Sequence, residues 1–280
     1  LRPLRKTQMK DAFVCECDGM LSDALARRYP WLSAGKVRLL VSGKNVRLRG
    51  VRVSSDVRVC RGDEAEVFLP SSFAPPETDV IYSDDNIVVA DKPAHTDSVR
   101  ALPALLRPSF GELYPAHRLD TNTTGIIVLA RGERALSALE KAFRARTVKK
   151  KYEAVVVGTM PSPSGTLRCY LIKDDKRGLV RASDAPSRGA VEAVTDYEVT
   201  GGGDGLSYVA LYPHTGRTHQ LRVQLAHAGC PILGDGKYGD FAENRRRGES
   251  EQRLRATGIK FLSVPAPLEY LAGREFEVKK

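Results

Sequence analysis

Residues 117–130 have the sequence HRLDTNTTGIIVLA. A polar segment that contains Arg118 and Asp120 runs directly into the apolar stretch 125–130. A short apolar run after a polar turn predicts a buried strand, and loops held by a rigid scaffold often carry catalytic residues. The segment therefore predicts a functional carboxylate at the entrance to a core strand. The alternative is a turn aspartate that caps backbone N–H groups, with Arg118 as a surface charge.

Strands and helices are predicted on the C-terminal and N-terminal sides of this segment. β-branched and aromatic residues favour strands, and apolar residues three and four apart favour helices. We expect strands at 86–91, 152–157, 191–199 and 208–212, and helices at 133–146 and 219–228. The glycine-rich stretch 201–205 predicts a hairpin loop. The arginine-rich stretch 245–255 predicts an exposed loop, either solvated or in contact with phosphate.

The N-terminal part has a different pattern. Residues 1–20 lack a clear period, whereas helical spacing appears at 21–29 and again between Ser33, a candidate N-cap, and Gly43. Alternating valines over 46–59 predict short strands, and the Pro- and Ser-rich stretch 70–78 predicts a linker. We therefore expect a small domain at 11–69 and a larger one at 79–280.

The charge of the chain is positive and uneven. The 280 residues contain 44 Lys and Arg against 34 Asp and Glu, a net charge of +10. Residues 1–69 alone hold 14 basic and 8 acidic side chains. Such a balance favours a polyanionic partner, although a merely basic protein remains the alternative. Arg27, Arg28, Lys36 and Arg38 are predicted to form a positive face over the two N-terminal helices.

Several classes of protein lose support from the sequence. No apolar run approaches the roughly 20 residues of a membrane span, so no membrane partner is expected. Five irregularly spaced cysteines without CxxC fit a reducing intracellular compartment, either the cytoplasm or an organelle matrix such as the mitochondrion. His214 and His219 have no third ligand for zinc beside them. GxGxxG, GxxxxGK[ST] and GxSxG motifs do not occur, which argues against dinucleotide chemistry, phosphate-loop NTPases and serine hydrolases.

Four segments in order resemble the motifs of the RluA-type pseudouridine synthase family. Residues 117–125 resemble its HRLDxxTSG signature, with Thr124 in place of the serine, and 150–154 resemble its K-x-Y motif. Residues 214–239 resemble its TGRTHQLR…GDxxYG motif. Residues 91–94 resemble its NKPAG motif, with His95 in place of the glycine, and the stretch that leads on to the aspartate is shorter.

The resemblance implies a reaction. Enzymes of this family break the bond between uracil nitrogen and ribose, turn the base and rejoin it through carbon 5. No metal and no organic cofactor is implied, because the reaction is neither a hydrolysis nor a redox step. The family's catalytic aspartate falls on Asp120, which is expected to act as a nucleophile on carbon 1′ or as a base at carbon 2′. An ionised carboxylate in a dry pocket needs a cation, and the matching residue is Arg222, with Arg217 as a weaker candidate.

Further roles follow from the resemblance. Tyr152 is implied to stack on the target base and to assist proton removal at carbon 5; the alternative is a core tyrosine. Arg118 is implied to occupy the gap that the flipped base leaves. Leu225 and Ile232 either line the pocket or belong to the core.

The resemblance also implies the architecture and the partners. The large domain is expected to be α+β, with a mixed, largely antiparallel sheet and a central cleft. The small α/β domain resembles, less closely, an RNA-binding domain that many of these synthases share with a small-subunit ribosomal protein. We expect a monomeric enzyme that acts on structured RNA, with ribosomal RNA ahead of transfer RNA and with ribosomal assembly particles as further partners. The alternative is a catalytically silent RNA-binding or ribosome-assembly factor; a hydrolase acting on nucleic acid lacks a ligand set or a triad.

Overall fold

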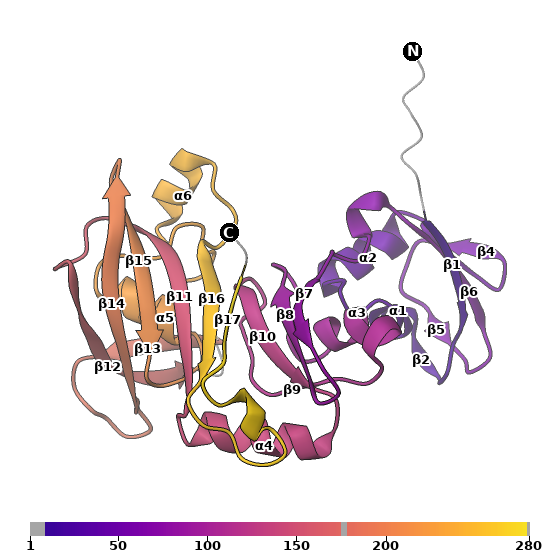
Figure 1. Cartoon of the computed structure of the whole chain (residues 1–280). Coiled ribbons are helices and arrows are strands. Elements are labelled where there is room, and N and C mark those ends of the chain that lie inside the picture. Colours follow the sequence, from indigo (N-terminus) through magenta and orange to yellow (C-terminus); the bar gives the residue numbers. More distant parts are fainter. Residues whose placement is uncertain (1–8, 175–177, 279–280) are drawn as a thin grey trace. The chain divides into compact units, whose positions relative to one another are not determined.

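A computed structural model describes residues 9–174 and 178–278, and Figure 1 shows its helices and strands. The chain forms two compact units. The smaller unit runs to Glu77 and also takes in Arg100–Leu105, whereas the larger unit consists of Thr78–Val99 and the chain from Leu106 onward. The return of Arg100–Leu105 to the smaller unit has no signal in the local sequence pattern. It divides helix α3 (Ala101–Phe110) between the two units.

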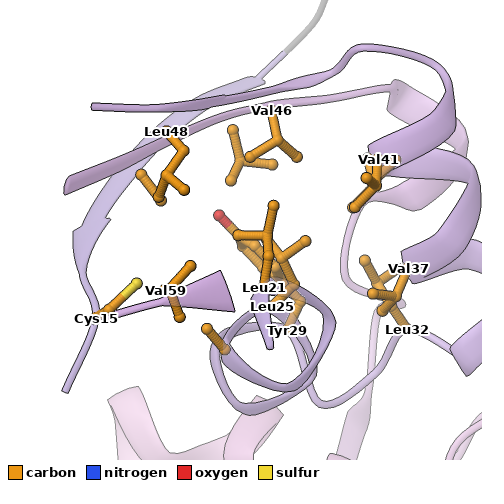
Figure 2. Close-up of a cluster of buried hydrophobic side chains, with 14 of the residues drawn as sticks. Cys15, Leu21, Leu25, Tyr29, Leu32, Val37, Val41, Val46, Leu48 and Val59 are labelled. Atoms are coloured by element: carbon orange, nitrogen blue, oxygen red, sulfur yellow. The ribbon is translucent and has the colours of Figure 1, made fainter. Parts of the chain in front are cut away.

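The smaller unit packs two helices on an antiparallel sheet. The sheet has the order β1-β6-β3-β4, formed by Met9–Val14, Glu64–Leu69, Val46–Leu48 and Val51–Val53. Strands β2 (Gly19–Met20) and β5 (Arg58–Val59) pair separately. Helix α1 (Leu21–Arg28) and helix α2 (Ala34–Ser42) supply apolar side chains to one core, in which Figure 2 shows Leu21, Leu25 and Val41 close to Val46. Ser33 caps α2 by accepting the N–H of Lys36, as its position predicts.

The stretch that was expected to be irregular contains strand β1. Its side chains do alternate, but the residue that faces inward beside Phe13 is a carboxylate, Asp11. Asp11 accepts hydrogen bonds from the Arg28 guanidinium at 3.0 Å and from the Tyr29 hydroxyl at 2.9 Å. A polar residue on the inner face removes the apolar alternation by which a strand is recognised.

The predicted positive face of the two helices is only partly available. Arg28 is held in the ion pair with Asp11, and the Lys36 ammonium lies 5.6 Å from the centre of the Phe73 ring. Arg27 and Arg38 are exposed. Of the four predicted cations, these two have the side chains that are best placed to reach a partner.

The larger unit is built on a mixed, largely antiparallel sheet, as expected. Its strand order is β13-β12-β14-β15-β11-β16-β10-β8-β7, with β17 and β9 at the side. The strands are β7 (Asp79–Ser83), β8 (Ile87–Lys92), β9 (Tyr114–Pro115), β10 (Thr124–Ala130), β11 (Val148–Val157), β12 (Ser164–Asp174), β13 (Leu179–Ser183), β14 (Val191–Gly203), β15 (Leu206–Pro213), β16 (Leu254–Phe261) and β17 (Glu275–Glu277). Within the described residues, β10 and β16 form the one parallel pair.

In the described part of the larger unit, three whole α-helices and one short 3-10 helix accompany this sheet, besides the second half of α3. They are α4 (Glu133–Arg144), α5 (Gln220–His227), α6 (Phe241–Arg247) and η2 (Glu269–Leu271); a further 3-10 turn, η1 (Ser71–Phe73), lies in the predicted linker. The apolar face of α4 packs in a core with strands β8, β10 and β16. None of the helices in the described ranges is long and apolar enough to cross a membrane.

Two predicted loops are partly regular structure. Strand β14 continues to Gly203, so the turn of the hairpin is formed by Asp204 and Gly205, which both have positive φ. The predicted loop 245–255 begins in the last turn of α6 and ends in β16. Arg246 and Arg247 both pair with Glu243 one turn earlier on α6, and this i,i+3 and i,i+4 pairing supports a helix that apolar periodicity does not reveal.

Ala256 on β16 brings two distant segments together. Gly125, at the start of β10, pairs with Ala256 on one side, and Tyr152 of β11 pairs with it on the other. Gly125 has φ 110, and a Cβ there would lie 2.1 Å from the Ala256 carbonyl oxygen, so only glycine fits. The β11–β16 register shifts between Lys151 and Tyr152. Irregularities of this kind are common next to active sites, where they change the direction of a side chain. The Asp120 loop and Tyr152 therefore meet at one place in the sheet.

Candidate active site

A cleft of about 630 Å³ opens in the larger unit. Its lining comes from the loop 117–123, the end of α4 with the start of β11, the segment 213–222 that leads into α5, and Leu254 at the start of β16. Asp120, Tyr152 and Arg222 are all among its lining residues. The cleft also carries the cations Arg144, Arg146 and Lys149 on its wall, which suits a polyanion.

The loop that bears Asp120 is fastened at alternate positions. The His117 Nε2 accepts the Val128 N–H at 3.1 Å, and the Ser98 hydroxyl bonds both the N–H and the carbonyl of Leu119. The Thr121 carbonyl accepts from the Lys92 ammonium at 3.1 Å. Arg118 and Asp120, the residues in between, line the cleft together with His117 and Leu119. Such anchoring holds the Asp120 carboxylate in one position at the end of a rigid strand.

Lys92 is fully buried and ties this loop to the preceding one. Its ammonium donates to the carbonyls of Pro93 at 3.0 Å and Thr96 at 2.9 Å in addition to Thr121. Burial lowers the pKa of Lys92 to about 8, although the negative charge of Asp120 opposes that shift. The three acceptors match the three hydrogens of an ammonium, so Lys92 serves as a fixed crosslink beneath Asp120.

Arg222 joins two carboxylates. Its Nη1 donates to Asp120 Oδ2 at 2.8 Å, while Nε and Nη2 donate to Asp235 Oδ2 and Oδ1 at 2.7 and 2.9 Å. The Arg222 side chain is 8% exposed, Asp120 is 19% exposed and Asp235 is completely buried. The predicted partner of Asp120 is therefore present, but its orientation is set by the two-point contact with Asp235.

The electrostatics of this triad follow from burial and charge. Burial by itself would raise the pKa of Asp235, but the Arg222 hydrogen bond and charge, with the N–H groups of Tyr238 and Lys237, outweigh it and lower that pKa. Burial would lower the pKa of Arg222, and the two carboxylates reverse this and raise it. Both effects keep Arg222 and Asp235 ionised, so a fixed cation faces Asp120.

Tyr152 is buried beside the same carboxylate. Burial raises its pKa, and the charge of Asp120 raises it further. The hydroxyl therefore keeps its proton across the ordinary pH range. A protonated phenol on the wall of the cleft can stack on a base and exchange a proton with it. It is not a phenolate in the resting enzyme.

His219 lines the cleft beside Asp120 and contacts Tyr238. His219 Nε2 lies 3.9 Å from Asp120 Oδ2, and its Nδ1 is 2.8 Å from the Tyr238 hydroxyl. Burial lowers the pKa of His219, although the negative charge of Asp120 opposes this shift. The Tyr238 ring also lies 5.1 Å from the Arg222 guanidinium carbon.

A buried amide network positions helix α5 and with it Arg222. Gln220 Oε1 accepts from the Thr215 hydroxyl at 2.7 Å and from the Arg217 N–H at 3.0 Å, and Gln220 Nε2 donates to the Thr195 hydroxyl at 2.9 Å. Gln224, one turn on, accepts from that same hydroxyl at 2.6 Å. These bonds fasten the first turn of α5 to β14, so that the guanidinium reaches the cleft from a fixed helix.

Other predicted site residues take different places. Arg118 and Arg217 are exposed on the cleft wall, and Arg217 Nε donates to the Glu192 carbonyl and makes no contact with Asp120 within the described structure. Leu225 and Ile232 are buried in the core, and neither lines the cleft. The cations of α1 and α2 belong to the smaller unit.

Reasoning from the sequence assigned no role to Asp235 or Tyr238, and it weighed His219 only as a zinc ligand. The sequence did point to two of them, because Asp235 and Tyr238 are the specified aspartate and tyrosine of the GDxxYG motif. A buried aspartate in a motif that also supplies an arginine is a candidate partner for that arginine. Lys92 carried a similar signal as the lysine of residues 91–94.

The sheet and cleft define the class of enzyme. The chain superimposes on the solved structure titled Human RNA Pseudouridylate Synthase Domain Containing 1 with a TM-score of 0.64 and 25% identity, over 74% of this chain and 85% of that one. The Vibrio cholerae protein named ribosomal large subunit pseudouridine synthase C is 30% identical over 83% of this chain and 84% of its own length. Its Vibrio parahaemolyticus namesake is 32% identical over 68% of this chain, and the match spans 65% of that relative.

The family model described as RNA pseudouridylate synthase matches residues 86–227, which is just over half of the chain. This chain therefore belongs to the RNA pseudouridylate synthase family, and it is an enzyme of that class. The matched range contains Asp120, Tyr152 and Arg222, whereas Asp235 and Tyr238 lie just beyond it.

Proposed function

We propose that this enzyme converts specific uridines of structured RNA into pseudouridine, with ribosomal RNA as its first substrate class and transfer RNA as the second. One observation carries the proposal: the Asp120 carboxylate lies in a cation-walled cleft, held by a buried Arg222 that Asp235 fixes in place. The names of the two Vibrio relatives, which refer to the large ribosomal subunit, support ribosomal RNA as the substrate.

The chemistry rearranges one nucleotide without a co-reactant. The bond between uracil N1 and ribose C1′ breaks, a bond between C5 and C1′ forms, and the hydrogen lost from C5 is balanced by the one gained at N1. Asp120 either forms a transient bond to C1′ or removes and returns a proton at C2′. Because Arg222 engages Oδ2, we assign the reacting role to Oδ1. No metal ion or organic cofactor enters this scheme.

Side chains around Asp120 have distinct roles in the proposal. Tyr152 stacks on the uracil and assists proton removal at C5. Because burial keeps its hydroxyl protonated, it can do so only as a relay that gives up its own proton as it takes the one from C5. Arg118, exposed at the cleft wall, occupies the space that the flipped uridine leaves in the RNA. Arg144, Arg146 and Lys149 contact the phosphates on either side.

The smaller unit, for which we propose the boundaries 11–69 followed by a linker at 70–78, adds sequence-independent RNA affinity. Arg27 and Arg38 supply its phosphate contacts, with Lys36 and Arg28 at their side. We also propose that the enzyme acts as a monomer. All five cysteines are free thiols and two are exposed, which supports a reducing compartment, either the cytoplasm or a mitochondrial-type matrix.

The experiment maps pseudouridines across all cellular RNA with and without the protein, and then with the Asp120→Asn variant. We expect sites that disappear without the enzyme, return with the wild type and stay absent with the variant, because an amide supplies neither nucleophile nor base. The variant should still bind RNA within a few-fold. Full restoration by Asp120→Asn would contradict the proposal and favour the alternative, a silent RNA-binding or ribosome-assembly factor.

A further inference from the structure

His219 stands opposite Asp120 across a narrow gap in the cleft. It precedes α5 in a left-handed conformation with φ 54. Its Nε2 is 3.9 Å from Asp120 Oδ2, and 17% of its side chain is exposed. A non-glycine residue in this conformation needs its surroundings to hold it, and such positions gather at functional sites.

The hydrogen-bond partners determine which ring nitrogen of His219 carries the hydrogen. The Tyr238 hydroxyl accepts the Val180 N–H at 2.9 Å, so its own hydrogen is available for His219 Nδ1 at 2.8 Å. Nδ1 is then the acceptor, and in a neutral imidazole Nε2 must carry the hydrogen. Burial lowers the pKa of His219 and so favours that neutral form. A fixed N–H donor therefore faces the space beside the Asp120 carboxylate.

One polar atom can contact both groups. Nε2 and Oδ2 are too far apart for a direct hydrogen bond, but an oxygen that lies to one side of the line joining them can be about 3 Å from each. A hydroxyl satisfies both neighbours, because it donates to the carboxylate and accepts from the imidazole N–H. Either role of Asp120 brings C1′ or C2′ of the target ribose against its carboxylate, and the 2′-hydroxyl is attached to C2′.

We propose that His219 Nε2–H donates a hydrogen bond to the 2′-hydroxyl of the target nucleotide, which in turn donates to Asp120. This inference rests on the proposed function and adds a specificity to it. His219 and Asp120 together recognise ribose at the reacting position, and Tyr238 positions His219 by fixing its tautomer. The 2′-hydroxyl is the group by which a protein distinguishes RNA from DNA at a given nucleotide.

The test compares two versions of one short RNA that contains a uridine mapped as above. One version has ribose at that uridine and the other has 2′-deoxyribose. Single-turnover rates are measured for the wild type, His219→Leu and His219→Gln. We expect the wild type to prefer the ribose version about tenfold, the effect of one net hydrogen bond. His219→Leu should slow the ribose reaction by a similar factor and lose most of the preference, because only the Asp120 contact to the 2′-hydroxyl remains. His219→Gln, whose amide can still donate, should keep more of it.

The ratio of the two rates separates recognition from a structural role. A structural defect slows both reactions equally and leaves the ratio unchanged, so a His219→Leu enzyme that keeps the full ratio overturns the inference. Tyr238→Phe removes the Nδ1 contact that fixes the tautomer but leaves Nε2 in place, so the ratio should fall, and it should fall less than in His219→Leu. If His219→Leu does not fold, His219→Asn replaces it, because its shorter amide does not reach the gap. A wild-type enzyme that forms no pseudouridine in the ribose RNA contradicts the proposed function itself.

Discussion

Arg222 donates two hydrogen bonds to Asp235 and one to Asp120. Asp235, which does not contact substrate in the proposed reaction, therefore holds the Arg222 guanidinium more firmly than Asp120, which does contact it. A cation fixed in this way can face Asp120 without following its movements, and electrostatic support of this kind is effective because it is already in place when the reaction begins.

Asp235→Asn should destabilise the enzyme and abolish its turnover. Breaking one side of a buried ion pair costs about 3–5 kcal/mol, and Arg222 loses the contact that aims it. Urea unfolding measures the loss, and Glu275→Gln is the control, because its pair with Lys260 at 3.1 Å is about half exposed and should contribute less than about 1 kcal/mol. Equal losses of unfolding free energy in the two variants would show that the buried Arg222–Asp235 contact stabilises the enzyme no more than the exposed pair does.

The stability of the wild type relative to Asp235→Asn should depend on pH. Arg222 and backbone N–H groups hold the pKa of Asp235 below its ordinary value in the folded state. The unfolded chain therefore binds the proton first as the pH falls. The wild-type advantage is present in full above the unfolded pKa of about 3.9 and shrinks as the pH drops below it. Unfolding curves at pH 7, 5 and 3 check this sign.

Arg222→Met leaves two carboxylates without their cation, and the second mutation that best rescues it should be Asp235→Asn. Asp235 is completely buried, whereas Asp120 is 19% exposed and can be hydrated from the cleft. Removing the more deeply buried unpaired charge recovers more free energy of unfolding. Both double variants should be inactive. A larger recovery from Asp120→Asn would mean that the depth of burial does not determine how much each unpaired carboxylate lowers the free energy of unfolding.

His117 should make the enzyme lose stability in mild acid. Burial, with the nearby Lys150 charge, lowers the pKa of His117 to about 3, and its Nε2 accepts the Val128 N–H. The unfolded histidine takes up a proton near pH 6.5, so stability falls from there down to the folded pKa by up to about 1.4 kcal/mol per pH unit. His117→Gln keeps an acceptor but does not titrate. Parallel stability curves for the two proteins between pH 7 and 5 would contradict this account.

Arg27→Gln and Arg38→Gln should each flatten the salt dependence of RNA binding. Each lost phosphate contact lowers the slope of log K against log salt by about 0.7–0.9, and both side chains are exposed. Arg246→Gln is the control, because Glu243 already pairs with Arg246 at 2.6 Å. Filter binding or fluorescence anisotropy over a salt series measures the slopes. If Arg246→Gln changes the slope as much as Arg27→Gln, the salt dependence gives no evidence that Arg27 contacts RNA and Arg246 does not.

Local patterns in the sequence determined a large part of the fold. The apolar run 125–130 lies in strand β10, the periodic stretch 133–146 contains helix α4, which ends at Arg144, and Ser33 caps α2 where its type and position predict. These elements were predictable because each one follows from the spacing of apolar residues or from one capping side chain. Strands β12 and β13 were missed because much of their surface is exposed, so apolar alternation is weak.

The order of strands was decided only by the tertiary structure. Strand β16 lies more than a hundred residues after β10, yet it pairs between β10 and β11 and joins Gly125 and Tyr152 at Ala256. Local spacing carries no information about such pairing, because it depends on which distant backbone groups satisfy one another.

The site shows the same division. The motifs of the sequence predicted that Asp120, Tyr152 and Arg222 carry the chemistry, since residue type and order are enough to match a carboxylate, a phenol and a cation to a known pattern. That Asp235 sets the direction of Arg222, and that His219 faces Asp120 across 3.9 Å, required the folded chain. Burial and distance determine the strength of a charge pair, and both exist only once the segments have packed together.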